Sequence, residues 1–474
     1  RVAFRPRPRS PRARSGSGTA GTASFAVSRG RDRARRLGLL VRSRSLAMAP
    51  PPPRSSRYRT HHALELAVNA CGVESCPHEP LAGVLAVASY LHVPGDDSNP
   101  QTRVGELNLF RLRSRDDAAA GAPSSYALEP ASTPSPTRAI FELRWAPERW
   151  SDVDGAACLA QADAGGYLTL YRVERDESEE GEGEGARVGR STDHTLRVAE
   201  LASLRCGGGG LGMCTCVDWN PAGGPRSADA DALAVVGADG GLRLIAHECG
   251  REVGAKGASR SLLRVSAEKL DAHDDAAWAV AYAPLPSVGP PLFTGADDCA
   301  FKGWDPRAGL EAPVFVERKA HGAGVTCVAP RPDDPWLVAT GSYDDRVRFW
   351  DVRALRRPAQ TQDAVDVGGG AWRLRWHPDG RRLICAAMGG GVVEIEAGGE
   401  EGGEAGGEAG SEAGGASNKA TRGETFAAAA PAYLEHGSIA YGADWGFRAG
   451  PRGVPDVVAS CSFYDRGVRA WSRA

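Results

Sequence analysis

Histidine, aspartate and serine side chains that can move protons or attack a carbonyl recur at matched places in the second half of the chain. His273 and His321 each precede a segment of alternating apolar residues, and Asp344 stands six residues before a Trp. A histidine or carboxylate can act as a general base, and a serine hydroxyl can be the nucleophile of an ester hydrolase. The candidate catalytic groups are therefore His273, His321, Asp344 and Ser342. The alternative is that the His and Asp residues form a structural hydrogen-bond network with the nearby Trp.

Aromatic side chains recur at a second set of matched positions. Three open short apolar segments and two precede an aspartate in a turn: Trp278, Trp372, Tyr441, Tyr343 and Tyr464. If these segments are strands around one axis, up to six aromatic side chains, counting Phe141, converge around one opening. Aromatic faces gathered in this way attract a cation, above all a quaternary ammonium group. We predict that this set binds such a cation, with ordinary packing as the alternative.

The stretch from His321 to Arg353 shows which elements position these groups. Apolar residues alternate over 325–328, 337–341 and 347–350, and Pro, Asp and Gly separate the three segments. This pattern predicts three short antiparallel strands. The spacing from the His through Gly-Ser-x-Asp to Trp-Asp is that of one blade of a WD-repeat propeller. One blade cannot bury both of its faces, so sibling blades are expected.

Six sibling segments complete the predicted fold, an all-β seven-bladed WD40 β-propeller over residues 61–474. They are expected at about 71–113, 139–173, 214–246, 273–305, 372–395 and 436–471. The segment from His62 to Val68 has no hairpin partner beside it. We expect it to complete the outer edge of the last blade and hide an open strand edge.

Residues 1–60 have a different composition from the rest. The first 47 residues contain thirteen Arg and a single acidic residue, Asp32. This composition resembles an organelle transit peptide, but Met48 precedes the first plausible ordered segment, and we prefer a leader or gene-model extension. We expect residues 1–60 to be disordered. Flexible loops are expected at 114–137, 174–190 and 397–424, the last rich in Gly and Glu.

Charged residues stand next to the packing aromatics of the inner strands. Arg144, Asp218, Arg375 and Asp444 each precede a Trp. Strand alternation sends the two positions to opposite faces of the sheet. The aromatics are therefore expected to pack between blades, while the charged residues pair across blades or around the channel. Ligand binding is the alternative for the charged residues.

The overall composition excludes several classes. The formal net charge of −2 argues against a general grip on nucleic acid, and we see no apolar run long enough to span a membrane. Eleven scattered Cys suggest reduced thiols in a cytoplasmic protein. Cys71, Cys76 and His78 lack an evident fourth metal ligand, so we expect neither metal nor cofactor. We expect a monomer, and find none of the usual hydrolase or nucleotide-binding motifs.

Five motifs stand out in the second half of the chain: Trp278 through Gly303-Trp-Asp305, Ala339-Thr-Gly-Ser-Tyr-Asp344, Gly370-Ala-Trp-Arg-Leu-Arg-Trp-His-Pro378, Tyr441-Gly-Ala-Asp-Trp445 and Cys461-Ser-Phe-Tyr-Asp465. Together they resemble one family, the diphthine methylesterase WD-repeat proteins of diphthamide synthesis. The likeness covers blades four to seven closely and the earlier blades in outline.

The resemblance implies a function and a partner. The function is hydrolysis of the methyl ester of methylated diphthine, a modified histidine of elongation factor 2. The partner is elongation factor 2 itself. The modified side chain carries a trimethylammonium group, which the aromatic set would suit. The alternative function is that of a non-catalytic WD-repeat scaffold for a protein complex, a common role of this fold.

Overall fold

The chain forms seven antiparallel sheets over the part that the structure covers. The computed structural model describes residues 57–79, 81–95, 102–115, 125–147, 156–176, 195–207, 212–222, 232–250, 260–284, 292–354, 356–398, 424–446 and 457–474. Within these residues the only helix is a 3-10 turn, η3 (Pro306–Ala308). The prediction of an all-β protein is confirmed. Of the leader predicted to be disordered over 1–60, residues 1–56 lie outside this range, and the prediction is wrong for residues 58–60, which belong to a strand. Nearly all of the insertion predicted at 397–424 also lies outside this range.

The first three sheets in chain order are blades 1 to 3, and each starts with its innermost strand. Blade 1 holds β2 (Asn69–Ser75), β3 (Val84–Val93), β4 (Thr102–Arg115), β5 (Ser125–Pro130) and β6 (Ser135–Arg138). Blade 2 holds β7 (Ile140–Trp145), β8 (Ala157–Asp163), β9 (Tyr167–Arg175) and β10 (Leu196–Arg205). Blade 3 holds β11 (Cys214–Trp219), β12 (Leu233–Gly237), β13 (Leu242–Gly250) and β14 (Arg260–Lys269).

Blades 4 to 6 repeat this order. Blade 4 holds β15 (Ala277–Tyr282), β16 (Leu292–Ala296), β17 (Phe301–Trp304) and β18 (Phe315–Glu317). Blade 5 holds β19 (Val325–Pro330), β20 (Leu337–Ser342), β21 (Arg346–Asp351), β22 (Ala359–Gln360) and β23 (Val365–Asp366). Blade 6 holds β24 (Arg373–Trp376), β25 (Arg382–Ala386), β26 (Val392–Gly398) and β27 (Thr425–Tyr433).

Blade 7 joins the two ends of the propeller. It holds β28 (Ala440–Trp445), β29 (Val458–Ser462) and β30 (Gly467–Arg473), and its outermost strand is β1 (Tyr58–Glu65), which pairs antiparallel with β30. The Tyr58 ring centroid lies 5.0 Å from that of Trp471. The predicted closing strand is confirmed in its role, and it begins four residues earlier than expected because Tyr58 packs into blade 7.

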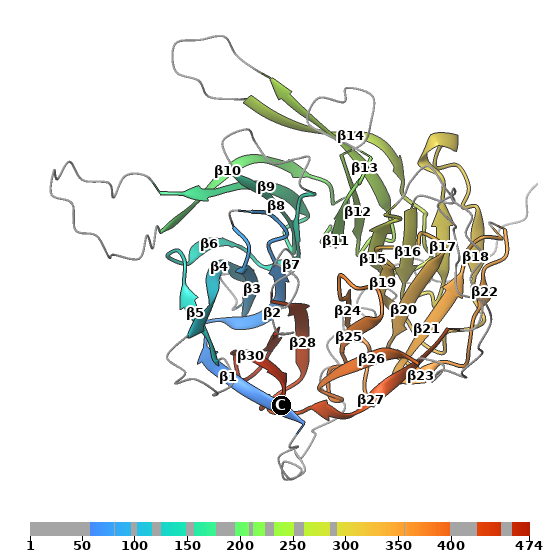
Figure 1. Cartoon of the computed structure of the whole chain (residues 1–474). Coiled ribbons are helices and arrows are strands. Elements are labelled where there is room, and N and C mark those ends of the chain that lie inside the picture. The colour runs from blue at the N-terminus through green and yellow to red at the C-terminus, as the bar shows by residue number, and fades with distance from the viewer. Residues whose placement is uncertain are drawn as a thin grey trace, which may run out of the picture. The chain divides into compact units, whose positions relative to one another are not determined.

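The innermost strands form a closed circuit. β2, β7, β11, β15, β19, β24 and β28 each contact the next one in this order, and β28 contacts β2 again. Figure 1 shows the seven sheets set around this centre. The predicted seven-bladed propeller is therefore confirmed, and the inner strands surround its axis, which we call the central channel.

Part of the segment predicted as a loop over 114–137 is structured. β5 and β6 both pair with β4. Pro and Ser suggested a loop, but Tyr126 and Leu128 are buried against the adjoining blade edge. The loop prediction is wrong for these strands. Most of the range 174–190 lies outside the described residues.

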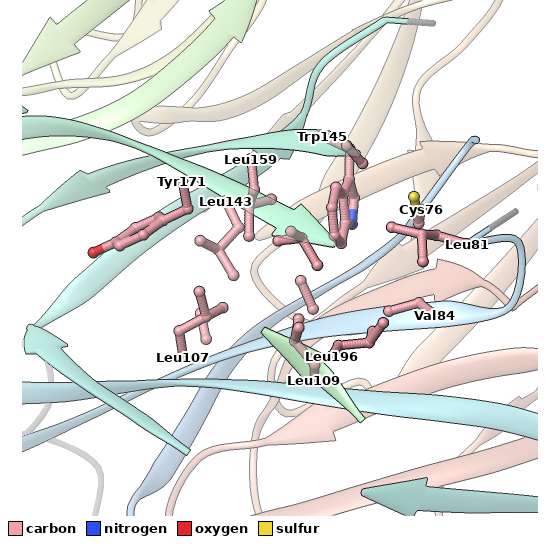
Figure 2. Packing of buried hydrophobic residues seen from close by; sticks show 14 of the residues in the cluster. Cys76, Leu81, Val84, Leu107, Leu109, Leu143, Trp145, Leu159, Tyr171 and Leu196 are labelled. Carbon is pink, nitrogen blue, oxygen red and sulfur yellow. The ribbon is translucent and has the colours of Figure 1, made fainter. Parts of the chain in front are cut away.

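Tryptophans at the ends of the inner strands connect neighbouring blades. Four of them donate an indole N–H to a backbone carbonyl of the preceding blade: Trp145 to Glu74 (3.2 Å), Trp219 to Arg144 (3.0 Å), Trp376 to Ala329 (2.9 Å) and Trp445 to Arg375 (3.1 Å). Trp145 belongs to the same buried cluster as Leu107, Leu109 and Leu196, which Figure 2 shows, and this cluster joins blades 1 and 2. The predicted packing of these aromatics between blades is confirmed.

Candidate functional site

Aromatic side chains from six blades meet around the axis of the propeller. Six of them form a closed circuit of neighbouring rings: Tyr90, Phe141, Trp278, Trp372, Tyr441 and Phe463. Successive centroids in this order are separated by 6.0, 6.4, 5.7, 5.1 and 5.2 Å, and 5.0 Å returns from Phe463 to Tyr90. Tyr343 joins at Trp372 (5.7 Å) and Tyr464 at Phe463 (5.1 Å). We call these eight residues the aromatic cluster.

A recurring irregularity of the inner strands places three of these rings. The pairing of β7, β15 and β28 with the next strand shifts register at Phe141, Trp278 and Tyr441. A bulge bends a strand and redirects the side chain that it leaves unpaired. In β19 the same shift falls at Thr326. In blade 5 this position is therefore a threonine and not an aromatic residue.

The exposure of the side chains increases across the cluster, from a buried floor to an exposed rim. Trp278 and Trp372 are 7% and 4% exposed, whereas Tyr343 is 37% and Tyr464 57% exposed. Burial nevertheless raises the pKa of the Tyr343 hydroxyl well above its usual range, so this phenol is neutral at physiological pH. The indole N–H of Trp372 has no hydrogen-bond partner among the residues that the structure describes.

A layer of paired charges lies next to the cluster. The buried carboxylate of Glu142 is 2.9 Å from Arg373, 2.9 Å from Arg144 and 3.3 Å from Arg375. Arg373 also donates to the backbone carbonyls of Phe141 (2.9 Å) and Trp372 (3.1 Å). This layer therefore joins blades 2 and 6 across the channel.

A small cavity opens beside these charges. Phe141, Glu142, Arg373, Gly72 and Gly442 line it together with five further residues, and its volume of about 10 Å³ is room for roughly one water molecule. A Cβ on Gly442 would lie 3.0 Å from the Gly72 Cα atom, so a larger residue would crowd the closure between blades 7 and 1.

The channel aspartates mainly stabilise the ring of blades. Asp218 accepts from the backbone N–H of Tyr282 (2.8 Å), and Asp444 accepts from that of Ser75 (2.8 Å), in each case one blade further on. Burial raises the pKa of Asp218 to about 6, although Arg144 opposes this shift. Arg144 lies 3.7 Å from Asp218, and Arg375 pairs with Glu142, so the predicted pairing is confirmed for these residues. The hydrogen bond of Asp444 across blades is instead to a backbone N–H group.

The candidate catalytic histidines lie inside their own blades. His273 Nε2 is 2.7 Å from the Thr294 hydroxyl, and its Nδ1 is 3.1 Å from Asp298. His321 Nε2 is 2.9 Å from the hydroxyl of Thr340. The hydrogen bonds of both imidazoles stay within their own blades, so the structure does not bring the rings into the aromatic cluster.

Ser342 and Asp344 flank Tyr343 of the cluster in the chain. The Ser342 hydroxyl donates to the Ala323 carbonyl (3.0 Å) and accepts from the Asp344 backbone N–H (3.2 Å). Both carboxylate oxygens of Asp344 bind Arg348, at 3.0 and 2.7 Å. A hydrolytic role for these four candidates stays a prediction.

The shared hydroxyl in blade 5 gives a stability prediction. The buried Thr340 hydroxyl accepts from the Trp350 indole N–H (2.8 Å) and contacts His321. Thr340→Val keeps the shape of the side chain but leaves the Trp350 indole N–H and the His321 ring without this hydrogen-bond partner. We therefore expect a loss of about 1–3 kcal/mol in unfolding free energy. Urea unfolding measures it. Thr361→Val, at an exposed threonine, is the control and should cost under about 1 kcal/mol. Equal losses would contradict the network.

Burial of His321 predicts a pH dependence of stability. Burial, with Arg348 nearby, lowers the pKa of His321 to about 4. Because this folded-state pKa lies below the unfolded value of about 6.5, the stability is complete above pH ~6.5 and is lost as pH falls towards 4. We expect His321 to account for a loss of about 2 kcal/mol between pH 6.5 and 5. Urea midpoints across this range should fall more steeply for the wild type than for His321→Gln; parallel curves would contradict the assignment.

Sequence reasoning missed four residues of this site. Tyr90 lies on β3 and Phe463 follows β29, so neither shares the inner-strand position that identified the other aromatics. Glu142 and Arg373 are single charges next to Phe141 and Trp372. A charge beside each of these two aromatics was the available signal.

Comparison with known proteins supports the same family as the motifs. Residues 313–351, which include the three main strands of blade 5, match the family model "WD domain, G-beta repeat". Diphthine methyltransferase of Mus musculus is 29% identical over 339 residues, covering 69% of this chain and 61% of that protein. The chain is similar to the diphthine methyltransferases. The resemblance inferred from the motifs is confirmed.

Other diphthine methyltransferases give the same result. The human protein is 26% identical over 342 residues, covering 68% of this chain and 65% of its own length. The Dictyostelium discoideum homolog is 30% identical over 243 residues, covering 49% of this chain and 59% of its own. The chain thus spans about three fifths of the length of the diphthine methyltransferases that it matches.

The described residues show neither a metal centre nor a membrane span. No group of three or more His, Cys, Asp or Glu side chains is placed to hold a metal ion in this part of the chain. His78 instead contacts the Ala146 carbonyl, and Cys71 the Ile140 carbonyl. In the same residues no helix is long and apolar enough to cross a membrane.

Proposed function

We propose that this protein acts in diphthamide biosynthesis and hydrolyses the methyl ester of methylated diphthine on elongation factor 2. The aromatic cluster is the observation that carries the proposal. Its rim residues, Tyr343 and Tyr464, are open to a protein-borne side chain, and its floor is two indoles. The names of the relatives, which describe methyl transfer on diphthine, support the same substrate.

The cluster suits a trimethylammonium group for electrostatic reasons. Aromatic faces attract a cation, by about 0.5–1 kcal/mol at exposed sites and about 2 kcal/mol where the cation loses water. A quaternary ammonium has no N–H to satisfy, so it loses less than a lysine on entering an apolar site. In this proposal Trp278, Trp372, Tyr343, Tyr441 and Tyr464 bind the cation.

The reaction hydrolyses the methyl ester to a carboxylic acid and methanol. A water oxygen bonds to the ester carbonyl carbon, the bond from that carbon to the methoxy oxygen breaks, and the methoxy group leaves with a proton as methanol. The reaction needs a base and donors for the developing oxyanion. We retain His273, His321, Asp344 and Ser342 as candidates. Burial lowers the pKa of both histidines, which therefore stay unprotonated at neutral pH, as a base must.

Purified protein incubated with methylated elongation factor 2 tests the function. The expected result is one methanol for each elongation factor 2 and a mass loss equal to one methylene group. A scaffold would bind its partners and release no methanol at any protein concentration, which would overturn the proposal. Repeating the reaction with a chelator shows whether a metal takes part.

A further inference from the structure

A buried guanidinium lies against the face of the cluster's central indole. The Cζ atom of Arg373 is 5.0 Å from the ring centroid of Trp372, which itself neighbours Trp278, Tyr343 and Tyr441. Arg373 is 7% exposed. A cation held by the cluster would therefore sit close to a second, fixed positive charge.

The Glu142 carboxylate is shared between Arg373 and two further guanidinium groups, those of Arg144 and Arg375. Arg144 also has the carboxylates of Glu74 and Asp218 at 3.8 and 3.7 Å. Among the described residues, Glu142 is therefore the one carboxylate that Arg373 and Arg375 share. One Nη of Arg373 pairs with the Glu142 carboxylate and donates to the Phe141 carbonyl, and the other Nη donates to the Trp372 carbonyl. Its Nε–H donates to none of the residues that the structure describes. A charged residue that lines the cavity thus keeps one N–H group available as a hydrogen-bond donor.

These two features select a ligand with a particular charge pattern. A simple quaternary amine would be attracted by the aromatic faces and repelled by Arg373. A ligand with a carboxyl group on the carbon next to the ammonium nitrogen would bind both the aromatic faces and Arg373. Guanidinium donors match carboxyl oxygens in geometry and charge. The cavity beside Arg373 and Glu142 offers space for about one such oxygen.

We propose that Arg373 is a specificity-determining residue that binds a carboxyl oxygen beside the quaternary ammonium held by the cluster. The site would then recognise the carboxyl group of an N-trimethylated amino acid, as ester or as acid, and discriminate against quaternary amines without one. This inference rests on the proposed function, since it names the part of the substrate next to the cation. Glu142 acts as a positioning residue, because it holds the guanidinium in place.

Binding of two small probes to the full chain tests the inference. Trimethylglycine carries a carboxylate beside the quaternary ammonium, and choline carries a hydroxyl instead. Ligand-observed NMR titration should give a tighter Kd for trimethylglycine than for choline in the wild type. Arg373→Gln should weaken trimethylglycine about tenfold, the effect of losing a charge-assisted hydrogen bond, without weakening choline. Trp372→Leu should weaken both probes.

A second variant and the pattern of binding separate the possible outcomes. Arg373→Lys, which keeps the charge but not the planar fork, should retain part of the preference and serves if Arg373→Gln does not fold. Equal binding of both probes by the wild type, or an unchanged ratio in Arg373→Gln, would overturn the role of Arg373 alone. Failure of both probes to bind would overturn it together with the cation site of the proposed function.

Discussion

Replacing Trp372 with Leu is expected to lower kcat/KM for methylated elongation factor 2 about 30-fold. Trp372 contacts Trp278, Tyr343 and Tyr441 with centroid distances of 5.7, 5.7 and 5.1 Å, so its loss opens the middle of the cluster. A desolvated cation–π contact contributes about 2 kcal/mol, which is about 30-fold in rate or affinity. Leucine keeps the site apolar, so the change isolates the aromatic face. The effect should fall mainly on KM.

A second tryptophan in the same motif supplies the control. Trp376 is 3% exposed and bonds to the preceding blade, but it lies outside the cluster. Trp376→Leu should lower the melting temperature and leave kcat/KM of the folded protein unchanged. Trp372→Phe should recover most of the activity, because it restores an aromatic face. If Trp372→Leu had no effect on kcat/KM, the cluster would not be the cation site.

Replacing Glu142 with Gln is expected to cost about 3–5 kcal/mol of unfolding free energy. Glu142 is 5% exposed and is the carboxylate nearest to Arg373. Glutamine has almost the same shape, but it leaves buried guanidinium groups without their counter-charge, which is among the most destabilising changes in proteins. Urea unfolding of the whole chain measures the loss.

An exposed ion pair provides the matched comparison. Glu248 pairs with Arg264 at 2.9 Å, with side chains 55% and 51% exposed. Glu248→Gln should change stability by under about 1 kcal/mol, because water screens both charges. A loss in Glu142→Gln as small as this would mean that the three arginines do not depend on Glu142.

The repeated parts of the fold could be predicted because every blade must bury its inner strands in the same way. A strand that is buried on both faces needs apolar residues, tight turns and a Trp for the neighbouring blade, and these appear at regular spacing around Trp219, Trp376 and Trp445. The same regularity predicted the aromatic positions of β15 and β28. In β19 the same bulged position holds Thr326, so blade 5 contributes no aromatic ring from its inner strand.

The polar part of the site could not be predicted because it depends on closure of the ring. Arg373 and the Phe141 carbonyl are 232 positions apart in sequence, and only the circuit of seven blades brings blades 2 and 6 together across the channel. No local pattern marks such a contact. By contrast, the networks of His273 and His321 are local to a blade, and the alternative of a structural network describes their observed contacts.

Hydrolysis of methylated elongation factor 2 in water enriched in oxygen-18 tests the central claim most directly. The proposed reaction cleaves the bond between the carbonyl carbon and the methoxy oxygen, so the label should enter the new carboxyl group and the methanol should be unlabelled. Mass spectrometry of the modified peptide and of the methanol reads both. Labelled methanol, a methyl group found on another acceptor, or an intact ester after prolonged incubation would contradict the proposed ester hydrolysis.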